Sequence, residues 1–182
     1  MISTPRLVLR RFTREDAPAV QRLAGEREVA LNTLLIPHPY PDGEAERWIS
    51  THDEAFQRGD MPFAITTAED QRLIGAIGLH SKPDHDRAEI GYWIGLPFWG
   101  KGFATEAASA MLRHAFETLS LHRIYAMHFT RNPASGRVLQ KIGMRHEGTM
   151  RQAHKKWGEY LDTELYAIVR SDLRELSHLR RP

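Results

Sequence analysis

The chain has 182 residues, of which 41% are apolar and 26% charged, and its formal net charge is +2. This length and composition predict one globular domain with a core of its own. The lack of cysteine excludes disulfide scaffolds, cysteine-ligated metal sites and a cysteine nucleophile. The small net charge does not by itself favour nucleic acid as a partner.

No membrane partner is expected from the pattern of apolar residues. The first eleven residues lack the apolar run of a signal peptide, and no run approaches the roughly 20 residues of a membrane span. A cytoplasmic location is the resulting expectation.

The N-terminal half of the chain predicts a strand, two helices and three further strands. Apolar and polar residues alternate over 6–11, which indicates the first strand. Thr13 and Asp16 have the spacing of a capping box, which predicts a helix start. A second helix is expected over 43–57 after a proline-rich connection. Antiparallel hairpins then join strands over 63–67, 73–80 and 88–95.

A helix and a strand begin the C-terminal half. Apolar residues recur with a 3.6-residue period from Ala104 to Leu119, which predicts a helix. A strand is expected over 122–130.

A shorter helix and a last hairpin complete the predicted elements. Asn132 is a strong N-cap residue, and Gly143 suits the end of the helix that it opens. Strands over 144–153 and 160–169 should form a hairpin around 155–159, and the tail 174–182 is expected to fray. The order of elements predicts one mixed α/β domain with a largely antiparallel sheet.

The segment from Gly91 to Ala107 is the most informative stretch of the chain. It predicts a strand, a turn with glycines at Gly100 and Gly102, and then a helix. Backbone N–H groups of such a turn, together with the positive end of the helix, can bind an anion such as a pyrophosphate.

The same turn nearly matches a nucleotide-binding P-loop. Gly95, four residues, Gly100 and Lys101 fit the pattern, but Gly102 stands where a serine or threonine would bind Mg²⁺. The preceding hairpins also differ from the parallel βαβ unit that a P-loop needs. Nucleotide hydrolysis is therefore disfavoured, and the turn is expected to bind pyrophosphate without a metal.

In the sequence Trp99-Gly100-Lys101-Gly102-Phe103-Ala104-Thr105-Glu106-Ala107, the turn resembles the acetyl-CoA loop of GCN5-related N-acetyltransferases (GNAT). More narrowly, the chain resembles the ribosomal-protein N-terminal acetyltransferase subgroup. The resemblance covers essentially the whole chain, as one domain over 1–173, because 4–16, 132–144 and 158–166 also match family segments. Trp99 departs from the broad pattern, which has glutamine or arginine there.

The resemblance implies a GNAT fold and acetyl transfer from acetyl-CoA to an amine, without a metal. In that fold, helices flank a central sheet whose strands separate at the cofactor site. Backbone N–H groups near Trp93 and Ile94 would bind the thioester oxygen. The residues implied in cofactor binding are Trp93, Ile94, Trp99, Gly100, Lys101, Gly102, Phe103, Ala104, Thr105, Asn132, Ser135 and Arg137.

Two residues are candidates for catalysis. Many family members have a tyrosine acid where this chain has Leu139, so Ser135, which matches the subgroup's serine, is the candidate donor to the leaving thiolate. Glu89 shares a strand face with Gly91 and Trp93 and is the candidate base. The alternatives are an ordinary first-turn serine and a surface carboxylate paired with Arg87.

Other polar and aromatic residues have weaker functional interpretations. His128 lies near the expected site, although a structural role is the simpler explanation. Tyr160, Asp162 and Tyr166 match positions on the family's last strand, and Asp162 could equally cap the hairpin. The segment that usually forms the acceptor wall includes Tyr40, Trp48 and Phe56, the last two with core-like helical spacing.

The identity of the acceptor stays open in the sequence. A protein N-terminus and a small amine such as a polyamine, an antibiotic or an amino-acid conjugate are both compatible with the fold. A non-catalytic acetyl-CoA-binding module is the second reading, and nucleic-acid binding by the basic cluster is the third. The subgroup also makes a homodimer plausible. The basic cluster, which could equally be a solvated face, comprises Lys101, Arg131, Arg137, Lys141, Arg145, Arg151, Lys155 and Lys156.

Overall fold

The computed structural model describes residues 1–174 of the chain. Short 3₁₀ helices lie at Arg14–Asp16, Pro83–His85, Leu96–Phe98 and Arg170–Arg174. The tail predicted to fray, 174–182, lies outside the described residues except for Arg174. In chain order the strands and α-helices are β1 Ile2–Ser3, β2 Leu7–Arg10, α1 Ala17–Ala24, α2 Arg27–Leu31, α3 Glu44–Ser50, α4 His52–Gln57, β3 Met61–Thr67, β4 Leu73–Lys82, β5 Arg87–Ile94, α5 Phe103–Glu117, β6 Arg123–Phe129, α6 Pro133–Lys141, β7 Arg145–Lys156 and β8 Glu159–Val169.

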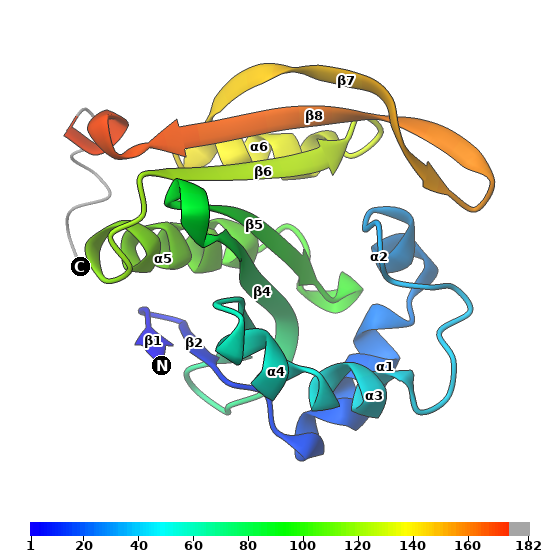
Figure 1. The fold of residues 1–182 in the computed structure, drawn as a ribbon. Coiled ribbons are helices and arrows are strands. Elements are labelled where there is room, and N and C mark those ends of the chain that lie inside the picture. The colour runs from blue at the N-terminus through cyan, green and yellow to red at the C-terminus, as the bar shows by residue number, and fades with distance from the viewer. Residues whose placement is uncertain (175–182) are drawn as a thin grey trace.

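Over residues 1–174 the strands form one eight-stranded sheet in the order β1-β2-β3-β4-β5-β6-β8-β7 (Figure 1). Every neighbouring pair is antiparallel except β5 and β6, which are parallel. The predicted mixed fold with a largely antiparallel sheet is therefore confirmed. None of the helices in the described part of the chain is long and apolar enough to cross a membrane.

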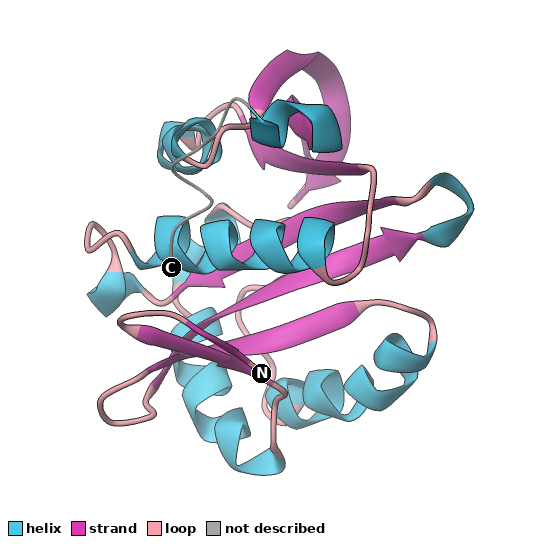
Figure 2. Cartoon of the chain, turned by 90° about the vertical axis from the view of Figure 1, so that its left-hand side faces the viewer, coloured by secondary structure: helices cyan, strands magenta, loops and turns pink. Residues whose placement is uncertain are grey.

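Helices cover both faces of the sheet. The larger core joins α5 and α6 to alternate residues of the strands, and Figure 2 shows α5 running alongside the central strands. On α5 the buried residues recur at helical spacing, as the sequence predicted. The smaller core packs α1 and α3 against Ala64 and Leu73 on the opposite face.

The helix predicted over 43–57 is in fact two helices, α3 and α4, which meet at Thr51. Thr51 donates through its hydroxyl to the carbonyl of Trp48 at 2.8 Å, and Ser50 donates to the carbonyl of Arg47 at 2.7 Å. Such local bonds compete with the continuing helix and favour its end at this point. The prediction missed α2, which has five residues, and β1, which has two. Both are too short for a periodic signal.

Two further boundaries differ from the prediction. Leu119 was assigned to the apolar face of α5, but that helix ends at Glu117 and Leu119 is exposed. The last hairpin turns at Trp157 and Gly158, whose φ angles are 50° and 89°. Positive φ at both central residues belongs to a two-residue turn, so the strands extend into the predicted loop 155–159.

Candidate functional site

The parallel strands β5 and β6 pair along only part of their length. Their ladder joins Arg87 to Arg123, Ala88 to Ile124 and Glu89 to Tyr125, after which β5 continues to Ile94 without a partner on this side. Figure 1 shows the two strands diverging from there. We call the region between 90–94 of β5 and 126–129 of β6 the fork. It is the opening in the sheet that the family resemblance predicted.

Backbone alternation along β5 determines which amides face the fork. The N–H of Gly95 donates to the carbonyl of Ile74 on β4 at 2.8 Å. Since alternate residues of a strand face opposite sides of its ladder, Trp93 also directs its amide toward β4, whereas Tyr92 and Ile94 direct theirs into the fork. The carbonyl of Ile94 accordingly bonds outside the ladder, accepting from the Trp99 indole at 2.6 Å. Of the two amides expected near the thioester, that of Ile94 faces the fork.

The glycine turn lies between the end of β5 and the start of α5. Gly100 and Gly102 have φ angles of 73° and 79°, a region that favours glycine, and Gly102 caps α5. Within residues 1–174, no hydrogen bond uses the N–H groups of 100–104. These amides, which we call the cradle, lie at the positive end of a 15-residue helix. The unpaired N–H groups of this turn, and the lack of a side chain at Gly100 and Gly102, suit the binding of a pyrophosphate.

The cradle is held from behind by the N-terminal segment. Arg6 donates to the carbonyl of Lys101 at 3.0 Å and to the carboxylate of Glu106 at 2.6 Å. Thr4 donates to the same carboxylate at 2.7 Å. Burial alone would raise the pKa of Glu106, but the bonds from Thr4 and Arg6 outweigh it and lower that pKa. Because Arg6 neutralises Glu106, a carboxylate near the cradle does not repel an anion.

Asn132 and Ser135 lie where the chain leaves β6 for α6. The side-chain oxygen of Asn132 accepts from the N–H of Ser135 at 3.2 Å, so Asn132 is the predicted N-cap. The hydroxyl of Ser135 lies 2.9 Å from that of Tyr92 on β5. Burial raises the pKa of Tyr92 to about 12, although the bond to Ser135 acts in the opposite direction. Leu139, where many family members have tyrosine, is buried in the larger core.

Glu89 lies at the closed end of the fork, in the last residue pair before the strands separate. Its partner in the register is Tyr125, whose pKa is raised by burial and by the negative charge of Glu89. Arg87 places its guanidinium over the Tyr125 ring at 5.9 Å. Glu89 is half-buried, on the same strand face as Trp93. That face packs against the smaller core, whereas Tyr92 lies on the other face of the strand and packs against the larger core.

His128 is buried beside the first turn of α6. Its Nδ1 lies 2.8 Å from the carbonyl of Phe129, whereas its Nε2 has no partner among the described residues. A Cβ atom at Gly136 would lie 2.8 Å from that Nε2, so only glycine fits there. The ring stacks on Tyr166 at 5.6 Å. His128 and Tyr166 therefore pack against α6 at Gly136.

The other candidates on the last hairpin lie further away. Tyr160 is 63% exposed near its tip. Asp162 accepts from the N–H of Gln152 at 2.7 Å, which holds the irregular stretch of β7 between Met150 and His154 and not the hairpin turn. In the expected acceptor wall, Trp48 packs edge-on against Phe12, and Phe56 against Phe63, as the core interpretation predicted. Tyr40 contributes to a surface cavity near Gln21.

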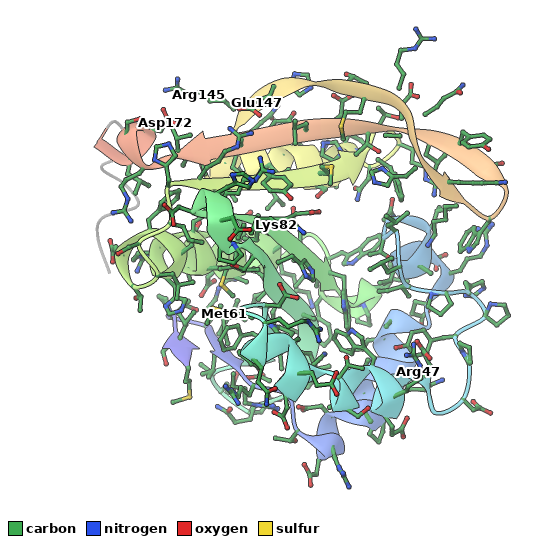
Figure 3. All side chains as sticks on the ribbon, in the orientation of Figure 1. Arg47, Met61, Lys82, Arg145, Glu147 and Asp172 are labelled. Carbon is green, nitrogen blue, oxygen red and sulfur yellow. The ribbon has the colours of Figure 1, made fainter. Side chains whose placement is uncertain are left out.

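The basic residues do not form one patch around the cradle. Lys101 and Arg137 are exposed, on the glycine turn and on α6. Arg145 pairs with Asp172 at 3.1 Å at the far edge of the sheet, where Figure 3 shows both side chains. Arg131 donates to the carbonyl of Leu31 at 2.6 Å. The predicted cluster is therefore divided among several places.

Sequence reasoning missed two sets of contacts between distant segments of the chain. Lys156 is buried and donates to the carbonyls of Leu34 and Ile36, at 3.1 and 2.9 Å. The contact of Tyr92 with Ser135 was also missed. Both join residues more than 40 positions apart, and no local pattern signals them. Within residues 1–174, no three His, Asp or Glu side chains are placed to hold a metal ion.

Comparisons with known proteins agree with the fold. A family model described as an acetyltransferase (GNAT) domain matches residues 6–145. The uncharacterized N-acetyltransferase YoaA of Bacillus subtilis (strain 168) is 36% identical over 172 residues, 93% of this chain and 97% of the relative. The ribosomal-protein-serine acetyltransferase of Escherichia coli (strain K12) is 33% identical over 114 residues, 62% of this chain and 63% of the relative. The crystal structure of a GNAT-family acetyltransferase from Bacillus anthracis has a TM-score of 0.84 at 28% identity, covering 92% of this chain and 97% of that one.

Proposed function

The chain belongs to the GNAT acetyltransferase family and is an acetyl-CoA-dependent N-acetyltransferase, and from this premise we propose that its acceptor is the amino group of a protein N-terminus. The fork with the cradle at its edge supports the use of acetyl-CoA, and similarity to a ribosomal-protein acetyltransferase supports the acceptor. The cradle would hold the pyrophosphate of acetyl-CoA through the amides of 100–104, and the fork would admit the acyl end of the molecule between the two strands.

The residues around the fork have the functional groups that acetyl transfer requires. Acetyl-CoA supplies an activated acyl group when bound. Ile94 offers an N–H to the oxygen that becomes negative, because its amide faces the fork. Glu89 would accept the proton that the amine must lose, directly or through water. Ser135 would donate a hydrogen bond to the leaving sulfur.

Similarity to an enzyme that acts on ribosomal protein supports the choice of a protein N-terminus. The charges after β6 do not decide between the two kinds of acceptor, because Arg131 lies 4.0 Å from the carboxylate of Glu159, which partly compensates its charge.

An acceptor panel tests the proposal. Peptides that begin with serine or alanine should release CoA and gain one acetyl group at the terminal amine, located by mass spectrometry. The same peptides with a blocked N-terminus and an internal lysine are the control. Faster acetylation of spermidine than of any free peptide would indicate a small-amine enzyme, and CoA binding without turnover on the whole panel would indicate a binding module.

Glu89→Gln tests the proposed base with the best acceptor from that panel. The variant should lower kcat by about 10²-fold or more and remove the acidic limb of the pH–rate profile. Tyr125→Phe is the matched control, since it alters the partner of Glu89 and keeps the carboxylate. An unchanged profile in Glu89→Gln would exclude the base role.

The homodimer that the subgroup makes plausible stays a prediction, and sedimentation velocity tests it.

A further inference from the structure

One hydrogen bond connects the two sides of the fork at the site of the proposed chemistry. Tyr92 lies three residues beyond Glu89, where β5 has already left β6. Ser135 lies on the helix that follows β6. Their hydroxyl oxygens are 2.9 Å apart, and the Tyr92 oxygen is 3.4 Å from the carbonyl of Ser135. Glu89 and Trp93 lie on the other strand face, so Tyr92 and Ser135 meet on the face of the sheet that α5 and α6 cover.

The chemistry of the two hydroxyls determines which of them donates. A phenol is far more acidic than an aliphatic alcohol and is the better donor. The Ser135 oxygen and carbonyl are the only partners that the described structure gives the Tyr92 hydroxyl. Burial raises the pKa of Tyr92 to about 12, so this side chain keeps its proton at neutral pH. If Tyr92 donates to Ser135, the proton of Ser135 is free to point elsewhere.

We propose that Tyr92 is a positioning residue: its hydroxyl donates to the oxygen of Ser135 and so directs the Ser135 O–H into the fork, toward the sulfur of CoA. The inference rests on the donor role given to Ser135 in the proposed function. It also accounts for Leu139, because Ser135, oriented by Tyr92, then supplies the donor that the helix tyrosine supplies in many family members.

No proton needs to leave either side chain in this arrangement. As the carbon–sulfur bond breaks, its electron pair passes to sulfur, and the Ser135 O–H stabilises that negative charge by a hydrogen bond. Tyr92 strengthens the bond by occupying a lone pair of Ser135 and polarising its hydroxyl. Solvent protonates the thiolate after it leaves.

The pKa of the thiol in bound CoA measures this donor without any acceptor. The chain has no cysteine, so the S–H stretching band in a Raman spectrum of the complex arises from CoA alone. The band should titrate at lower pH in the wild-type complex than in free CoA. Ser135→Ala should move the titration back toward free CoA, and Tyr92→Phe should give at least half of that change. The double variant should match Ser135→Ala, since the two residues act as one unit.

Structural damage would give a different pattern. Tyr92→Phe removes one oxygen, so CoA affinity and melting temperature should stay near the wild-type values while kcat falls about 10-fold, with KM for acetyl-CoA unchanged. Tyr125→Phe, a tyrosine of the neighbouring strand, is the matched control and should leave the thiol titration unaltered. A titration in Tyr92→Phe equal to wild type, or effects of the two variants that add, would overturn the inference.

The two proposals fail separately in these measurements. A wild-type protein that lowers the thiol pKa through Tyr92 but acetylates no amine would overturn the proposed function and support the positioning role. Rapid acetyl transfer with the same thiol pKa in wild type, Ser135→Ala and Tyr92→Phe would overturn the positioning role and support the proposed function.

Discussion

At the scale of single residues, Gly102 and Gly43 allow the cradle to be tested with a close control. Both cap a helix, and their φ angles are 79° and 75°. A Cβ atom would meet nothing within 4 Å at Gly43 and only the Arg6 guanidinium at 3.5 Å at Gly102. Alanine at either position therefore carries the same backbone strain, about 1–2 kcal/mol. The two sites differ in that only Gly102 belongs to the cradle.

We expect Gly102→Ala and Gly43→Ala to lower the free energy of unfolding by similar amounts, whereas only Gly102→Ala weakens acetyl-CoA binding. The reason is that relaxation of the strained turn moves the amides of 100–104 away from their common focus. Urea unfolding and calorimetric titration measure the two quantities. Equal affinities in the two variants would show that the cradle does not bind the cofactor.

The residues of the site differ in how far the sequence could predict them. Gly100, Gly102 and Asn132 were predicted because their roles depend on backbone conformation and immediate neighbours, which local sequence encodes. The partner of Ser135 was not, since Tyr92 reaches it only after β5 and β6 have separated and α6 has packed. The burial that raises the pKa of Tyr92 likewise exists only in the folded chain.

At the scale of elements, prediction succeeded where periodicity was long and failed where it was short. α5 and the central strands have buried residues at regular spacing, so both were predicted within a few residues. α2 has five residues and gives no such signal. The break between α3 and α4 depends on hydroxyl bonds that a hydrophobic pattern does not contain.

The last hairpin gives a pH-dependent prediction for one buried cation, Lys156. Burial, with a smaller effect of the Arg131 charge, lowers the pKa of Lys156 to about 8. In the unfolded chain that pKa returns to about 10.4. Between these values the unfolded chain binds more protons, so this group makes the free energy of unfolding rise with pH from about 8 upward. Below pH 8 both states hold the proton, and the contribution is constant.

In Lys156→Met the free energy of unfolding should therefore lack this rise with pH. The difference in unfolding free energy between wild type and variant should grow in favour of wild type from pH 7 to pH 9.5. Urea unfolding at the two pH values measures the difference. Lys155→Met is the control, because Lys155 is exposed on the adjacent position and its variant should follow the wild-type pH dependence. Parallel behaviour of Lys156→Met and wild type would contradict the prediction.

At the scale of the whole molecule, the sheet consists of two parts with a narrow connection. β1 to β5 form one part and β6 to β8 the other, and three residue pairs join them in the ladder. The cradle and Ile94 belong to the first part, whereas Asn132 and Ser135 belong to the second. A ligand that contacts all of them would bridge the two parts and bind the folded state alone.

Acetyl-CoA should therefore raise the melting temperature, and Mg-ATP should not. At 100 times its dissociation constant a ligand adds about 2.7 kcal/mol to the folded state. For a chain of this size 1 kcal/mol corresponds to about 2–4 °C, so the expected rise is about 5–11 °C. Mg-ATP is the control because Gly102 replaces the hydroxyl residue of a P-loop, and the cradle alone should not hold a metal–nucleotide complex. A rise with Mg-ATP as large as with acetyl-CoA would mean that the cradle recognises any polyphosphate, and no rise with acetyl-CoA would mean that the two parts of the sheet are not bridged.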